Sequence, residues 1–173
     1  MPDDAQSDSF IERLIGAAKL NPRIYREVEY DPHALWQSFV VVMLASAGTW
    51  IGVTGRIRLS GILFAAAIGL IGWVIWTSTV YVIGVKLLPQ AQTKATWGQL
   101  LHTTGFATGP GIISALGIFP SLTGFAPFIT DLWILTAFVV AARRALDYDS
   151  TWRALAVCFM GWCVYAGAIL ILK

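Results

Sequence analysis

Residues 96–119 have the sequence TWGQLLHTTGFATGPGIISALGIF, and this stretch decides the fold. Its length and apolar content are those of a membrane-crossing helix, since about 20 apolar residues span the roughly 30 Å hydrocarbon core of a bilayer. Pro110 interrupts the helix, because proline has no N–H to donate to the carbonyl of Phe106 and its ring clashes with the preceding turn. Gly109 and Gly111 add backbone freedom on either side. Broken backbone at membrane depth needs protein or water to satisfy its freed groups, so we expect Gly109, Pro110 and Gly111 to be buried in the centre of a bundle.

The composition indicates the same class of protein. Of 173 residues, 57% are hydrophobic and 13% are charged, whereas soluble domains contain about 25% charged residues. The net charge of +2 is too small to indicate a nucleic-acid partner. Cys158 and Cys163 lie five residues apart in one apolar run and face different sides of a helix, so neither a disulfide nor a metal site is expected from them. We expect no cofactor.

Four further apolar stretches accompany the broken one. They cover residues 34–54, 60–85, 125–142 and 151–172. Each is long enough, or nearly so, to cross the hydrocarbon core as a helix. The sequence therefore predicts an all-α fold: a polytopic membrane bundle of five transmembrane helices in which the third is broken.

A short helix is expected before the first span. Ser9 and Glu12 form a capping box at its start, and apolar residues recur on one face at Phe10, Ile11, Leu14, Ile15 and Ala18. The segment is too short and too charged to cross a membrane, so we expect it to lie in the headgroup plane. The alternative is a helix packed against its own bundle. The chain thus divides into a cytoplasmic segment, residues 1–33, and a five-helix transmembrane domain, residues 34–173.

Small residues form faces on the first two spans. These residues are Gly48 and Gly52 in the first span and Gly61, Ala65 and Gly69 in the second. Such faces let helix backbones approach closely in lipid. Because the linker of residues 55–58 is very short, we expect the two spans to pack against each other within one chain. Dimerisation through these faces is the alternative.

Basic residues indicate the orientation of the chain. Most Lys and Arg residues fall in the N-terminal segment and in the second and fourth loops. The positive-inside rule then places the N-terminus in the cytoplasm and the C-terminus outside the plasma (cell inner) membrane. Four of these cations are candidate contacts for anionic lipid headgroups: Lys86, Lys94, Arg143 and Arg144. The alternative is that they only set the topology.

Ionisable residues inside the spans are few. His102 and Asp131 form the candidate polar intramembrane site, since such groups within a bilayer are commonly functional. Their predicted depths differ by about 13 Å, from a rise of 1.5 Å per residue across a 30 Å core, so we expect no direct pair. Alternatively, Asp131 stabilises the start of its helix and His102 is a satisfied buried side chain. No catalytic or metal-binding motif is present, so we expect no enzyme.

Two segments resemble a known family. They are LLPQAQTKATWGQLLHTTGFATGPGIISALGIFP, residues 87–120, and DLWILTAFVVAARRALDYDSTWRALAVC, residues 131–158. A Leu-Pro loop, a Thr-Trp cap, a Gly-Phe-Ala…Pro broken span and an Arg-x-Ala-Leu-Asp turn follow in the order found in Yip1-domain membrane proteins of the bacterial and archaeal type. The resemblance implies five transmembrane helices and a cytoplasmic N-terminus. Eukaryotic relatives bind Rab-type GTPases, but this chain lacks their Asp-Leu-Tyr-Gly-Pro signature, so that function is not transferred.

The functional expectation is a non-enzymatic integral membrane protein. We expect a scaffold, an accessory subunit or a membrane-organising factor that docks on a larger membrane complex. Its expected partners are membrane lipids and either another membrane protein or further copies of itself. The alternative is a small transporter or channel that uses the broken third helix, because half-helix ends coordinate substrates in such proteins.

Overall fold

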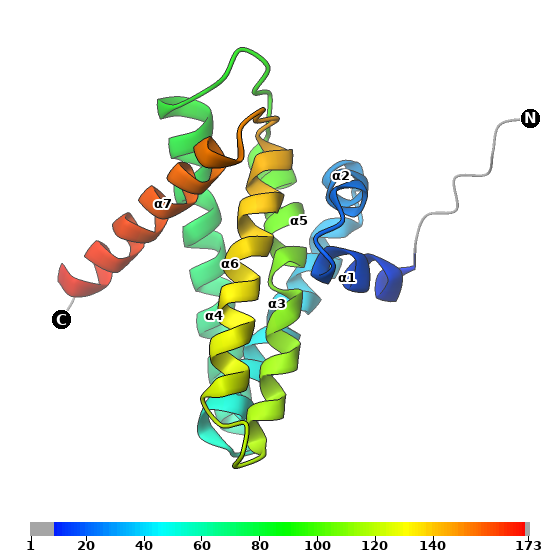
Figure 1. The fold of residues 1–173 in the computed structure, drawn as a ribbon, viewed down its shortest axis with the longest axis vertical. Helices are drawn as coiled ribbons and strands as arrows, with labels where there is room; N and C mark the ends of the chain where they lie inside the picture. The colour runs from blue at the N-terminus through cyan, green and yellow to red at the C-terminus, as the bar shows by residue number, and fades with distance from the viewer. Residues whose placement is uncertain (1–8, 172–173) are drawn as a thin grey trace, which may run out of the picture.

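The computed structural model describes residues 9–171, with side-chain burial described through residue 163. Within that range every regular element is a helix, so the predicted all-α class is confirmed. The elements are α1 (Phe10–Ala18), α2 (Pro22–Tyr30), α3 (Ala34–Thr54), α4 (Leu59–Tyr81), the π-helix η1 (Val82–Leu87), α5 (Trp97–Ala107), the 3₁₀ helix η2 (Gly109–Ile118), α6 (Phe125–Ala145) and α7 (Thr151–Ile171). Figure 1 shows α3 to α6 as a long bundle, with α1 and α2 beside it and α7 slanting away on the opposite side. The prediction that the C-terminus lies outside the membrane concerns residues 172–173, which are outside the described range.

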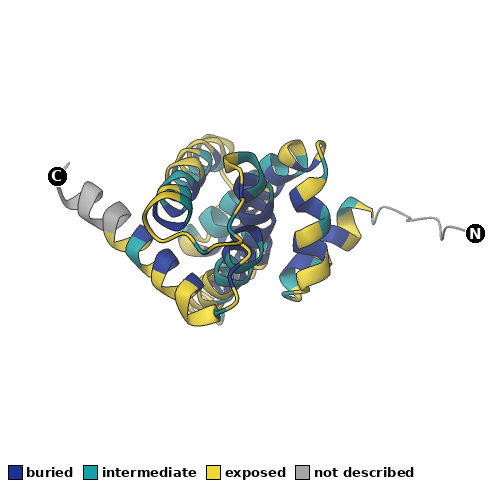
Figure 2. Cartoon of the chain, turned by 90° about the horizontal axis from the view of Figure 1, so that it is seen from above, coloured by how far each residue is buried: buried dark blue, intermediate teal, exposed yellow. Residues whose placement is uncertain are grey.

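Three of the described helices are long and apolar enough to cross a membrane by length and composition. They are α3, the continuous helix of α4 and η1, and α6. Their outer faces are also apolar, with Leu63 and Phe64 on α4 and Phe128 and Leu132 on α6 among the exposed side chains. Figure 2 shows the buried residues gathered on the inner sides of the helices. A bundle with an apolar outside and a small polar content inside is suited to lipid rather than water.

The predicted third span consists of two helices of different pitch. The capping box of Thr96 and Gln99 starts α5, and Pro110 stands in the first turn of η2, where its missing N–H breaks no helical hydrogen bond. In η2, Gly111, Ser114 and Gly117 recur every three residues, which places them on one face of a helix with 3.0 residues per turn. This face is pressed against α3.

The contact between α3 and η2 is closer than side chains would allow. A Cβ atom on Gly52 would lie 1.8 Å from the carbonyl oxygen of Ser114, and one on Gly117 would lie 2.5 Å from the carbonyl oxygen of Gly52. The two backbones therefore touch. Glycine on both helices is what permits an approach this close.

The N-terminal segment contains a second helix that the sequence analysis did not predict. Asn21 caps α2 by accepting a hydrogen bond from the backbone N–H of Arg23 (3.0 Å). Asparagine followed by proline at the first helical position is a recognised helix start. Both helices pack against the bundle: Tyr25 and Val28 of α2 lie in one apolar cluster with Phe106 of α5, and Trp133 on α6 donates to the carbonyl of Ala18 (2.7 Å). Tyr25 also joins α2 to α1 by donating to the carbonyl of Ala17 (2.9 Å).

Candidate functional site

The break in the third span is enclosed by protein. Gly109, Pro110 and Gly111 are all buried. A Cβ atom on Gly109 would lie 2.8 Å from Leu14 of α1, and one on Gly111 would lie 2.9 Å from Ala45 of α3. Helices α1 and α3 therefore shield the break from the surroundings of the bundle, which meets the requirement for irregular backbone at membrane depth.

The small-residue faces do not meet each other directly. Gly48 and Gly52 of α3 lie against η2, whereas Gly61 and Gly69 of α4 lie against α3, next to Trp50 and Ser46. A further member, Ala65, is half-buried on α4. The face on the first span thus contacts the third span, and the face on the second span contacts the first.

His102 and Asp131 are far apart along the bundle. The Nδ1 atom of His102 lies 3.2 Å from the carbonyl oxygen of Val28, on α2. Asp131 is exposed on α6, next to Thr130, whose hydroxyl is hydrogen-bonded to that of Ser114 on η2. Asp131 is therefore level with η2, the C-terminal half of the third span, whereas His102 lies in α5, its N-terminal half. The two residues form no joint site.

Buried hydroxyl groups link the helices instead, and the sequence analysis missed them. The Oγ1 atom of Thr104 lies 2.9 Å from that of Thr77 and 3.1 Å from the indole nitrogen of Trp73, which donates to it. It also donates to the carbonyl of Leu100 (2.6 Å). Threonines within the apolar stretches were the feature of the sequence that could have indicated these hydrogen bonds. Interhelical hydrogen bonds of this kind contribute on average about 0.6 kcal/mol each in membranes.

Arg143, one of the candidate headgroup cations, holds the turn between α6 and α7. It donates to the carbonyls of Tyr148 (3.2 Å) and Asp149 (2.9 Å) and to the hydroxyl of Thr151 (2.8 Å). Tyr148 in turn donates to the carbonyls of Gly84 and Leu88 at the end of η1. Much of the hydrogen-bonding capacity of Arg143 is therefore used within the protein.

Arg144 lines a polar pocket of about 390 Å³ at this end of the bundle, whereas the other two candidate cations, Lys86 and Lys94, are exposed outside it. The lining residues are Arg26, Gln92, Arg143, Arg144, Asp147, Tyr148 and Asp149. Next to the pocket, Glu29 of α2 is buried. Burial, and secondarily the charge of Asp147, raises the pKa of Glu29 to about 7.

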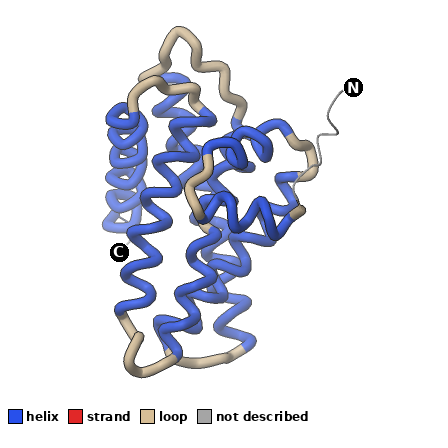
Figure 3. The backbone as a smooth tube through the Cα atoms, turned by 45° about the vertical axis from the view of Figure 1, so that its right-hand side comes forward, coloured by secondary structure: helices blue, strands red, loops and turns tan. Residues whose placement is uncertain are grey.

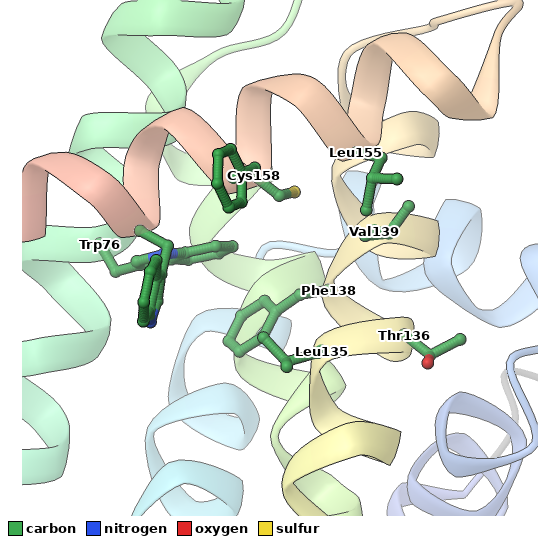
Figure 4. A pocket seen from close by; sticks show the side chains of 9 residues that line it. Trp76, Leu135, Thr136, Phe138, Val139, Leu155 and Cys158 are labelled. Atoms are coloured by element: carbon green, nitrogen blue, oxygen red, sulfur yellow. The ribbon is translucent and has the colours of Figure 1, made fainter. Parts of the chain in front are cut away.

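An apolar groove of about 450 Å³ lies between α4, α6 and α7 (Figure 4). It is lined by Trp76, Leu135, Thr136, Phe138, Val139, Leu155, Cys158, Phe159 and Trp162. At its floor the rings of Trp76 and Phe138 pack with centroids 4.3 Å apart. On its α7 wall Phe159 is 62% exposed and Trp162 is 54% exposed. The groove exists because α7 leaves the bundle at an angle, which no local pattern in the sequence could indicate.

The chain was compared with known proteins. A family model for the Yip1 domain matches residues 19–172. No curated protein matches the chain, and no solved structure matches it either.

Proposed function

The chain belongs to the Yip1 domain family, and from that premise we propose that it is an integral membrane protein that acts as a scaffold or accessory subunit by docking on another membrane protein. The partner contributes a transmembrane helix to the groove between α4, α6 and α7. The groove is the observation that carries this proposal: an open apolar surface with aromatic walls drawn from three helices.

The proposed topology has five crossings. The spans are α3, α4 with η1, α5 with η2, α6 and α7, and the N-terminus lies in the cytoplasm, as the distribution of basic residues predicts. The interrupted third span supports this count, because its 11 α-helical and 10 3₁₀ residues rise together by about 35 Å, enough to cross the hydrocarbon core.

The physics of helix association in lipid supports docking at the groove. Lipid tails are as apolar as leucine, so helices associate through close packing rather than through a hydrophobic drive. Acyl chains fill a rigid concave surface poorly, whereas side chains of a partner helix can interlock with it. The exposed rings of Phe159 and Trp162 offer large packing areas at small entropic cost.

The transporter or channel alternative is not favoured. Such a function needs space beside the broken helix, where half-helix ends would hold a substrate. In this chain Leu14 and Ala45 occupy the space beside the break, and on its C-terminal side the backbones of Gly52 and Ser114 are in contact.

Site-specific photocrosslinking tests the proposal. Benzoylphenylalanine is placed at Phe159 in the groove or at Phe64 on the outer face of α4, which is matched to it at 63% exposure. We expect irradiation of native membranes to join position 159 to one defined membrane protein that also co-purifies at fixed stoichiometry, and to give no such product at position 64.

Three results would count against docking on another protein. They are a solitary monomer in native mass analysis, equal products at both positions, and a product at position 159 that contains only two copies of this chain. The last result would assign the groove to self-association.

A further inference from the structure

We propose that α1 is embedded among the acyl chains of the cytoplasmic leaflet, below the headgroups, with α2 above it at headgroup level. The side and leaflet rest on the five-span topology proposed above. The proposed depth of α1 is argued from the contacts of α1 and α2 with the spans. The proposed contact of α1 with lipid is argued from the side chains of α1 that are exposed.

The positions at which α1 and α2 contact the third span give their relative depth. Val28 of α2 contacts His102, while Leu14 of α1 lies against Gly109. Seven residues separate these two positions of the third span, which places α1 about 10 Å further into the bundle than α2.

Helix α6 gives the same order independently. Near its C-terminus, Arg143 lines the same pocket as Arg26 of α2, whereas Trp133, ten residues earlier, donates to the carbonyl of Ala18 at the end of α1. Ten residues correspond to about 15 Å along the helix. Interfacial helices bury their apolar faces about 5–10 Å into the boundary between headgroups and acyl chains. With α2 at headgroup level, a separation of about 10–15 Å between the two helices puts α1 deeper than such a helix. Figures 1 and 3 show α1 beside the middle of the bundle.

The exposed residues of α1 are Ile11, Ile15 and the charged Glu12 of the first turn. Ile11 is 64% exposed and Ile15, one turn later, is 49% exposed. Phe10 and Leu14 pack toward the bundle. An exposed isoleucine pair next to a packed apolar face gives α1 hydrophobic contacts in two directions, toward protein and toward lipid.

The charge on α1 that would oppose such a position is neutralised inside the protein. Arg13 is only 4% exposed. Its guanidinium group donates to Glu27 (2.9 Å), to Asp31 and to Gln37 (3.0 Å). A buried cation in a low-dielectric region requires such partners, and here both carboxylates come from the side of α1 on which α2 lies.

The other charged side chains of this segment are Glu12 in the first turn of α1 and Lys19 just after its last residue, and both are exposed. The carboxylate of Glu12 accepts a hydrogen bond from the backbone N–H of Ser9 (2.7 Å). Lys19 follows the last residue of α1, and its long stem can carry the ammonium group toward the headgroups. On α2, Arg26 is exposed, and a cation at headgroup level can contact lipid phosphate groups.

Depth-dependent fluorescence quenching tests the proposal on the full chain. Cys158→Ala and Cys163→Ala provide a cysteine-free background, and Ile15→Cys or the α2 control Tyr30→Cys then carries an environment-sensitive dye. Tyr30 is 67% exposed. In phosphatidylcholine and phosphatidylglycerol vesicles, we expect chain-attached nitroxides to quench the dye at position 15 and dissolved iodide not to. The dye at position 30 should show the reverse.

The proposal is overturned if iodide or a headgroup nitroxide quenches position 15 as strongly as position 30. A separate label on Ser121→Cys, in the turn before α6, reports the topology by its reaction with an impermeant reagent. Reaction of positions 121 and 30 from the same side would refute the five-span topology, while the quenching at position 15 would still decide the depth of α1.

Discussion

Glycine residues allow the helices at the centre of this bundle to pack closely. Gly52 and Gly117 allow α3 and η2 to touch through their backbones. A hydrogen bond between Ser114 and Thr130 joins η2 to its other neighbour, α6. The small size of Gly52 was visible in the sequence. That its neighbour is the third span, rather than the second, depends on how the chain turns back on itself.

At this scale we predict that Gly52→Ala destabilises the bundle by about 1–3 kcal/mol, the usual range for overpacking. The added Cβ atom would lie 1.8 Å from a backbone carbonyl oxygen, which cannot rotate out of the way as a side chain could. Unfolding of the purified protein in mixed micelles, followed by circular dichroism, measures the loss.

The matched control for that substitution is Gly98→Ala in the first turn of α5. No atom lies within 4 Å of the position of its Cβ, and alanine favours a helix over glycine by up to about 1 kcal/mol. Unchanged or raised stability is expected there. Equal destabilisation by both substitutions would contradict the close contact between α3 and η2.

At the scale of elements, α1 and α2 both pack against the spans through apolar residues, and they differ in the charged groups that they bring. Helix α1 is joined through apolar contacts and a neutralised arginine, Arg13. Helix α2 brings the buried carboxyl group of Glu29 close to the like charge of Asp147. The second contact is therefore the one that responds to pH.

We predict that the docking of α2 weakens as pH rises. Burial, assisted by Asp147, raises the pKa of Glu29 to about 7, so the docked helix keeps a proton that a solvated glutamate releases at its ordinary pKa. The stabilisation is complete below that ordinary pKa and is lost as pH rises through about 7. Hydrogen exchange of the α2 amides, corrected for the intrinsic rate, should be faster at high pH than at low pH.

Glu29→Gln supplies the control for this prediction. The amide has a similar shape and no titrating proton, so the corrected exchange rates of α2 should become independent of pH. If the wild-type rates are already independent of pH, or if the glutamine variant keeps the dependence, Glu29 is not the group that controls docking.

The whole molecule is asymmetric across its width. Helices α1 and α2 lie on one side of the bundle and α7 slants away on the opposite side (Figure 1). Lipid or a partner protein thus meets two different surfaces: the isoleucine face of α1, and the aromatic groove beside α7. The proposed docking function uses the second surface and leaves the first to the bilayer.

The proposed five-span topology leads to a prediction for the whole molecule. Arg58→Cys, in the linker between α3 and α4, should react with an impermeant maleimide only from outside the cell. Lys94→Cys, in the loop between η1 and α5, should react only from the cytoplasmic side. Both positions are exposed in the structure. Reaction of both cysteines from one side would mean that α4 with η1 does not cross the membrane.

The features predicted correctly from the sequence are those that one segment decides alone. The apolar stretches, the capping box at Ser9 and the break at Pro110 depend on residues within a few positions of each other, so they can be inferred without knowing the fold. The family resemblance, carried by the order of such local features, was confirmed for the same reason.

The candidate sites were predicted less completely, because a site is an arrangement between segments. Cations, glycines and the pair of His102 and Asp131 could be named, but their neighbours could not. The contact of Gly52 with Ser114, the depth of α1 beside Gly109 and the groove beside α7 each join residues far apart in the chain. Such contacts follow from the angles at which the helices cross, and those angles are set by the packing of all the helices together, not by the residues of any one of them.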